Sequence, residues 1–345
     1  MDALFDATGS PGLAAAVVFV VGAAVTVLGS IRLATLGDVL ADRTGWGEAL
    51  FGAVFFGVMT SMSGIVMTAA TAADGRADLA YSNAVGGIAA QTVAIAVADL
   101  AYRRSNLEHA AASVENLMFG CLLIALLSLA LLATFAPEAT LLGLHPISGV
   151  MVVVYLGGLH LIRRRARTPM WTPVDTPETI IDQPEADDAP QTTAQLWAQF
   201  VAVGAVVVVA GWAIAEAAGV IVDVTGLGAG FVGIVLMGVV NAIPETVTTI
   251  AAVRRGATTL AVAAILGGNS LDALNLAVGD AFYGGGSIYH AASDGQLFVT
   301  VASLFMTAVL LGGLLVRQRT GPGRVGFEGV GLAVAYAGVV AVQVL

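Results

Sequence analysis

A carboxylate follows a proline inside an apolar segment of membrane-spanning length, in the run Gly238-Val-Val-Asn241-Ala-Ile-Pro244-Glu245. An ionised acid at the centre of a membrane helix costs about 2.5–3.5 kcal/mol on insertion scales, so Glu245 is a candidate functional residue. Pro244 has no N–H, and the carbonyl of Val240 therefore loses its helical partner. Asn241 lies one helical turn before Glu245, on the same helix face. These oxygen atoms together predict a site for a hard cation.

A second acidic residue occurs in the next apolar segment, in the run Leu266-Gly-Gly-Asn269-Ser-Leu-Asp272. Asn269 and Asp272 share a helix face, and the two glycines between Leu266 and Asn269 allow close helix contact or local unwinding. Two carboxylates and two amides, without thiols or clustered histidines, suit Na⁺ or Ca²⁺ better than a transition metal. The alternative is that both acids are protonated and structural, in which case each needs a buried partner.

The segments that position these residues occur twice in the chain. Residues 42–100 align without a gap on residues 223–281, an offset of 223 − 42 = 181. Glycines recur at matching positions in both copies, including Gly86 and Gly87, which align with Gly267 and Gly268. In a membrane protein, an internal repeat with interrupted helices indicates a transporter whose site lies between the two halves.

The composition indicates an all-α polytopic membrane protein and excludes an ordinary soluble globular protein. The chain has 345 residues, of which 58% are hydrophobic and 11% charged, and its mean hydropathy is +0.90. A β-barrel would need alternating segments, whereas these runs are continuously apolar. Runs of spanning length predict ten helices, at about 12–31, 47–73, 78–101, 111–135, 146–162, 194–219, 228–253, 259–281, 295–316 and 326–345.

The arginines predict the topology. The chain has 14 basic residues, all arginines, and an N-terminus outside places every one except Arg76 in cytoplasmic loops, as the positive-inside rule requires. The N-terminal residues lack a basic n-region, so the first span is expected to be retained rather than cleaved as a signal peptide. Five spans in each half give two inverted repeats, with helices 2, 3, 7 and 8 broken and the C-terminus also outside. The expected location is the plasma membrane.

Residues 164–193 are rich in proline, threonine and carboxylates, and we expect a cytoplasmic linker between a first repeat at 1–163 and a second repeat at 194–345. This segment is too short for a domain with its own core, although a regulatory role is the alternative to a passive one. The lack of lysine fits a high-salt cytoplasm and a GC-rich genome equally well.

Several classes of function are not expected. The net charge of −10 argues against nucleic-acid binding. The single Cys121 excludes an internal disulfide. No cofactor and no enzymatic activity are predicted, and a shared metal site is not expected among the scattered histidines, which are His109, His145, His160 and His290.

Residues 241–272, NAIPETVTTIAAVRRGATTLAVAAILGGNSLD, resemble the second α-repeat of the sodium/calcium exchanger membrane region, in the cation/calcium antiporter superfamily. That family's pattern is G-T-S-x-P-E followed by G-S-N-x-x-D/N, once in each inverted half. The matching residues here are Pro244, Glu245, Gly267, Asn269 and Asp272.

The first copy departs further from that pattern. It keeps Thr60, Ser61 and Gly86, whereas Gly64 stands in place of the family's glutamate and Gln91 in place of its final Asn or Asp. The site is therefore expected to be asymmetric, with its negative charge supplied by the second half alone.

The resemblance implies a secondary antiporter that exchanges Ca²⁺ or another cation for Na⁺ or H⁺ by alternating access within the lipid bilayer. It implies charged ligands and neutral ligands: Glu245 and Asp272 for the first, and Asn241, Asn269, Thr60, Ser61 and Gln91 for the second. Because Gly64 carries no carboxylate, the usual three Na⁺ for one Ca²⁺ is not expected. The alternative is a non-transporting or channel-like protein whose first repeat has lost its ligands.

Two further positions have ambiguous roles. Asp99 and Asp280 correspond in the repeat and lie about 12 Å past Gln91 and Asp272 along their helices, so we expect helix-end or gating carboxylates near the membrane surface. Ser63 can ligate a cation, but a bond back to its own helix is the expected role.

Overall fold

A computed structural model describes residues 10–44, 61–102, 105–141, 143–167, 170–174, 191–321 and 325–344. In these ranges the chain is helical, apart from turns, irregular connections and one isolated bridge between Leu141 and Leu144. The helices are α2 (Pro11–Thr44), α5 (Met62–Ala73), α6 (Ala77–Tyr102), α7 (Leu107–Ala111), α8 (Val114–Phe135), α9 (Pro146–Arg167), α10 (Thr193–Thr225), α11 (Ala229–Phe231), the π-helix η2 (Val232–Met237), α12 (Gly238–Arg255), α13 (Thr258–Asp272), α14 (Asn275–Phe282), α15 (Asp294–Val316) and α16 (Phe327–Val344).

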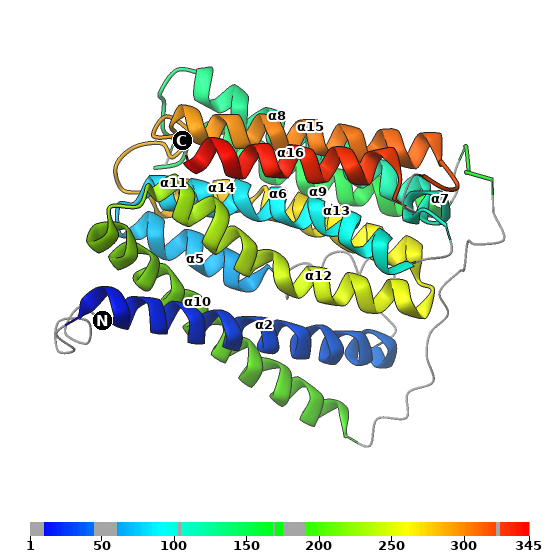
Figure 1. The fold of residues 1–345 in the computed structure, drawn as a ribbon, viewed down its shortest axis with the longest axis horizontal. Helices are drawn as coiled ribbons and strands as arrows, with labels where there is room; N and C mark the ends of the chain where they lie inside the picture. Colours follow the sequence, from blue (N-terminus) through cyan, green and yellow to red (C-terminus); the bar gives the residue numbers. More distant parts are fainter. Residues whose placement is uncertain are drawn as a thin grey trace.

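The all-α membrane fold is confirmed. Within the described ranges, 9 helical segments are long and apolar enough to cross a membrane, and α5 is a shorter apolar helix. α5 covers the end of the second expected span, 47–73, whose earlier part lies outside the described residues. The start of α2 and the end of α16 lie at the same end of the bundle (Figure 1), as an even number of spans requires.

The helices pack in layers (Figure 1): α2 and α10 form one side, α5, α6 and α12–α14 the centre, and α8, α9, α15 and α16 the other side. α2 and α10 run antiparallel, because Gly12 lies beside Val224 at one end and Gly29 lies beside Val207 further along. Each of these glycines on α2 packs against a branched side chain of α10. Such close packing stabilises helix contacts in a membrane, where the hydrophobic effect does not drive helices together.

Of the four expected helix interruptions, the one in the eighth span is visible, and most of the second span lies outside the described residues. α13 ends at Asp272, where the Leu274 N–H bonds to the Leu271 carbonyl in a tightened turn before α14 begins. The seventh span is not broken at Pro244, which lies inside α12; it changes instead to π-helical geometry over Val232–Met237. Such π segments often occur at functional sites.

The expected break in the third span is wrong, because α6 is continuous from Ala77 to Tyr102. Its glycine pair serves a close helix crossing instead. A Cβ atom at Gly86 would lie 2.5 Å from the Cα of Ile234, and one at Gly238 would lie 2.7 Å from the carbonyl carbon of Gly86. The backbones of α6 and α12 therefore touch, and neither glycine can accept a side chain.

Candidate functional site

One face of α6 carries the residues around which the site is arranged. Asn83, Gly87 and Gln91 follow one another at intervals of one helical turn, about 6 Å along the axis, and all three are buried. The amide of Asn83 donates to the Gly64 carbonyl of α5 at 3.1 Å and to the Thr68 hydroxyl at 2.9 Å. Asn83 thus contacts α5, and the two other residues of this face contact different helices.

The last residue of this face, Gln91, meets the carboxylate of the broken helix. Gln91 Nε2 donates to Asp272 Oδ2 at 2.7 Å, and Asn275 Nδ2 donates to Oδ1 at 3.3 Å. The hydroxyl of Ser61 faces the same carboxyl without forming a regular hydrogen bond. Gln91 and Asp272 are separated by 181 residues, the repeat offset, so equivalent positions of the two halves bond to each other.

The middle residue of this face, Gly87, makes room for Asn241. A Cβ atom at Gly87 would lie 2.6 Å from Asn241 Nδ2, and one at Gly64 would lie 2.6 Å from Oδ1 and 2.8 Å from Nδ2. The Asn241 amide is fully buried between the two glycines. It thus occupies the space beside position 64, where the expected pattern has a glutamate.

The register of α6 and α12 locates Glu245. Contacts advance in the same direction along both helices, with Gly233 beside Asn83, Gly238 beside Gly86 and Asn241 beside Gly87. Glu245 is one turn beyond Asn241, as Gln91 is one turn beyond Gly87, so the parallel helices bring Glu245 level with Gln91. The Glu245 side chain is only 3% exposed. Both acids of the second half therefore lie at the same level of the core.

The other sequence-predicted ligands differ in position. Asn269 is buried but turns to Thr92, with Nδ2 donating to the hydroxyl at 2.8 Å, rather than to Asp272. Ser61 is the N-cap residue of α5 and lies beside Asp272. Thr60 lies outside the described residues, and its expected role stays a prediction.

Asp99 and Asp280 act as helix-end acceptors, as expected. Asp280 accepts hydrogen bonds from the His145 N–H and the Ser148 hydroxyl, each at 2.7 Å, and from the Ile288 N–H at 3.2 Å. Asp99 accepts from two backbone N–H groups at the other end of the bundle. Both carboxylates are therefore engaged at helix ends rather than at the central site.

Sequence reasoning missed Asn83, Thr92 and Asn275. The available signal for Asn83 was its place on the same helix face as Gln91, two turns earlier. For the other two it was closeness in sequence, since Thr92 follows Gln91 and Asn275 is three residues after Asp272. The histidines are also less scattered than expected, because the rings of His145 and His290 lie 5.5 Å apart.

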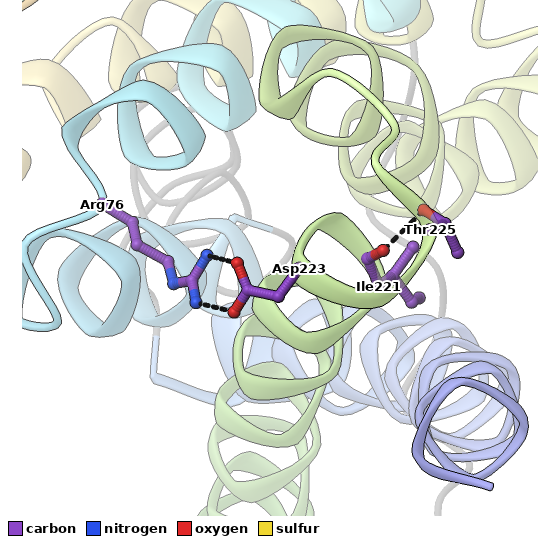
Figure 2. A network of polar contacts seen from close by, with 4 residues as sticks. All are labelled: Arg76, Ile221, Asp223 and Thr225. Atoms are coloured by element: carbon purple, nitrogen blue, oxygen red, sulfur yellow. Dashed lines mark hydrogen bonds and ion pairs between the residues drawn. The ribbon is translucent and has the colours of Figure 1, made fainter.

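Arg76, the arginine at the non-cytoplasmic end in the predicted topology, joins the outer helix pair to the core. Figure 2 shows its guanidinium facing Asp223 near the end of α10, with two parallel contacts, one of them 3.1 Å from Nη1 to Oδ1. The hydrogen bond to Asp223 raises the pKa of Arg76 above its ordinary value. Both groups are partly exposed, so the pair is a surface contact between α10 and the α5–α6 turn.

The arrangement can bind hard cations through oxygen. A cation beside Asp272 would be repelled by Gln91 Nε2, so ligation requires this amide to rotate and present Oε1, which accepts no hydrogen bond from a described residue. The Asn241 amide likewise has no hydrogen-bond partner among the described residues. Two acids with uncommitted amide oxygens match the ligand preference of Ca²⁺ and Na⁺ rather than that of a transition metal.

Comparisons with known proteins bear on the family and the fold. Residues 14–162 and 195–345 match the family described as sodium/calcium exchanger protein. Among curated proteins, no sequence matches the chain.

Three solved structures share the fold. The sodium-calcium exchanger NCX_Mj has a TM-score of 0.62 and 13% identity, over 95% of this chain and 97% of its own. Native YfkE has a TM-score of 0.62 and 15% identity, over 96% and 92%. The H⁺/Ca²⁺ exchanger CAX has a TM-score of 0.71 and 11% identity, over 96% and 86%. At these identities the likeness shows the two-repeat fold.

Proposed function

Because the chain belongs to the sodium/calcium exchanger protein family, we propose that it is a secondary antiporter that exchanges Ca²⁺ for Na⁺ or H⁺ across the plasma membrane. The observation that carries this proposal is the pair of buried acids, Glu245 and Asp272, at one level of the core beside the amides of Gln91 and Asn241. A buried carboxylate needs a proton or a cation to compensate its charge.

Competition for the same oxygens makes the exchange obligatory. When Ca²⁺ occupies the two carboxylates, Na⁺ or H⁺ cannot bind there. The protein changes the side to which the site opens only when either Ca²⁺ or the counter-ion is bound. Alternating access then follows if α2 and α10 move together across the core, since they form a separate layer (Figure 1) that contacts the core through α5 and α12.

The charge count supports an electroneutral cycle. Gly64 and Gln91 supply no charge where the family pattern can have an acid, which leaves the two carboxylates of the second half. One Ca²⁺ neutralises two carboxylates, and so do two Na⁺ or two H⁺. If each cycle moved one net charge, a membrane potential of about 100 mV would contribute about 2.3 kcal/mol per cycle. That free energy corresponds to about a 50-fold shift in the final Ca²⁺ gradient. An electroneutral exchanger shows no such shift.

Flux measurements in proteoliposomes test both claims. We expect Ca²⁺ uptake driven by an outward Na⁺ or H⁺ gradient, abolished in Glu245→Gln and Asp272→Asn, and kept in Glu138→Gln, which alters an exposed carboxyl. The final Ca²⁺ gradient should stay the same when a K⁺ gradient with valinomycin sets the potential. Uptake in neither wild type nor control would refute antiport.

A second candidate is a channel-like or non-transporting protein, favoured by the missing acids at Gly64 and Gln91. The same vesicles separate the candidates. Ca²⁺ flux that needs no counter-ion gradient indicates a channel, and it would also follow the membrane potential.

A further inference from the structure

Two glutamates are buried against each other beside Arg317, at the end of the bundle where α7 lies (Figure 1). Glu108 lies in α7 and Glu328 in the first turn of α16, and each is 1% exposed. Their carboxyl groups lie within hydrogen-bond reach of each other. Neither residue belongs to the cation site described above.

Asp99 fixes the two segments that carry these glutamates. Its Oδ1 accepts the N–H of Leu107 at 2.6 Å, and its Oδ2 accepts the N–H of Gly326 at 3.3 Å. Leu107 immediately precedes Glu108, and Gly326 is two residues before Glu328. The starts of α7 and α16 are therefore held together by one carboxylate of α6.

The place occupied by Glu328 is shaped by glycine. A Cβ atom at Gly313 of α15 would lie 2.6 Å from Glu328 Cγ, and the Glu328 carboxyl folds back over Gly326. Any larger residue at either position would displace the glutamate. This side chain is therefore packed into the protein, although a glutamate at the first turn of a helix could extend into solvent.

Neither glutamate has a donor. Within the described ranges, no other residue donates a hydrogen bond to a carboxyl oxygen of Glu108 or Glu328, although the N–H of Glu108 lies near its own carboxyl. The charged groups that act on Glu108 are Glu328 and Asp99. The guanidinium of nearby Arg317 donates to the carbonyls of His109 and Val174. The start of α13, which also packs on α7, contributes no titratable residue.

Two buried carboxyl groups in contact and without donors cannot both be ionised cheaply, whereas one proton between them forms a strong hydrogen bond. We propose that Glu108 and Glu328 form a proton-binding site, in which a single shared proton joins α7 to the start of α16.

The electrostatics agree in direction. Burial, followed by repulsion from Glu328 and Asp99, raises the pKa of Glu108 well above its ordinary value, and the nearby N–H of Glu108 itself does not offset this. Because the pKa is raised on folding, the stabilising proton is present at low pH and is lost as the pH rises through the folded-state pKa. Alkaline pH at this end of the protein should therefore loosen the contact between α7 and α16.

Infrared spectroscopy of the purified full-length protein tests the proton directly. At neutral pH we expect a protonated carboxyl band that disappears or shifts in both Glu108→Gln and Glu328→Gln but stays unchanged in Glu115→Gln, a partly exposed carboxyl at the start of α8. If no protonated carboxyl band responds to either variant, or if added Ca²⁺ removes it at constant pH, the proposal is wrong.

Thermal unfolding in detergent provides a second readout. Between the ordinary pKa of a glutamate and the raised pKa of Glu108 in the folded protein, the folded-to-unfolded ratio of the wild type should fall up to tenfold per pH unit for the one proton. Glu108→Gln should flatten this dependence. Equal slopes of stability against pH in the wild type, Glu108→Gln and Glu115→Gln would overturn the proposal. If one variant folds poorly, the infrared band of the wild type still tests the shared proton.

Discussion

Gly64→Ala should displace the Asn241 amide from its place between α5 and α6. The new Cβ would lie 2.6 Å from Oδ1 and 2.8 Å from Nδ2, whereas ordinary contacts are 3.4–4 Å. The amide has little room to retreat toward α6, because it already lies so close to Gly87 that a Cβ atom there would be only 2.6 Å from Nδ2. Overpacking of this kind costs about 1–3 kcal/mol in the free energy of unfolding.

A double-mutant cycle isolates the contact. Asn241→Ser shortens the side chain, so Gly64→Ala should cost less in that background, with a coupling energy of at least about 1 kcal/mol. The four proteins are compared by thermal unfolding in detergent and by Ca²⁺ binding. Gly157→Ala on α9 is the matched control, because a Cβ there meets nothing within 4 Å, and it should change stability by no more than about 0.5 kcal/mol.

Two results would refute this reasoning. One is additivity of the two substitutions within about 0.3–0.5 kcal/mol, and the other is a Gly64→Ala cost equal to that of Gly157→Ala. If the coupling is present, it also predicts that Gly64→Glu fails alone but is tolerated with Asn241→Thr. The double variant has a third central carboxylate, so its Ca²⁺ gradient should respond to membrane potential.

Three further substitutions test the packing and polar contacts. Gly86→Ala should prevent stable folding, measured by size-exclusion chromatography and thermal unfolding, because the Cβ meets the backbone of Ile234 at 2.5 Å; Gly312→Ala, where the position is open, should have little effect. Arg76→Gln should lower stability by less than about 1 kcal/mol, and the loss should shrink as salt is added, because its ion pair with Asp223 is partly exposed. Asp280→Asn should cost about 1–3 kcal/mol, since its amide would place a donor against the three donors that the carboxylate accepts; a melting temperature equal to that of the wild type would contradict this role.

The parts of the fold that depend on hydropathy and repeat identity could be predicted from the sequence. Apolar runs gave the helices, and Asp272 at the end of a Gly-Gly-Asn segment agrees with the observed break after α13. Local sequence could not show whether Gly86 unwinds its helix or lets another backbone approach, because both need a residue without a side chain. The partner that decides between them, Ile234, is far away in the chain.

For the site too, the local sequence does not show which distant residues are the contact partners. Residue types indicated that Asn241 and Gln91 are polar groups of the core, but their partners depend on helix register. Asn241 fills the space beside Gly64 because α5, α6 and α12 meet there, and no local pattern encodes that meeting. Asn269 shares a helix face with Asp272 and still turns to Thr92, since the neighbouring helix offers a hydroxyl at 2.8 Å.

The hydrogen bond between Gln91 and Asp272 has an evolutionary consequence. Both residues occupy the same position in two copies of one segment, so an ancestor with identical copies would have placed identical side chains face to face. Two aspartates there would repel each other, and two glutamines would supply no negative charge to a cation. Joining the copies in a single chain allows the two positions to diverge, with one keeping the charge and the other becoming its donor. An assembly of two identical half-length chains could not have reached this arrangement by any single substitution, because every change would appear on both sides of the axis.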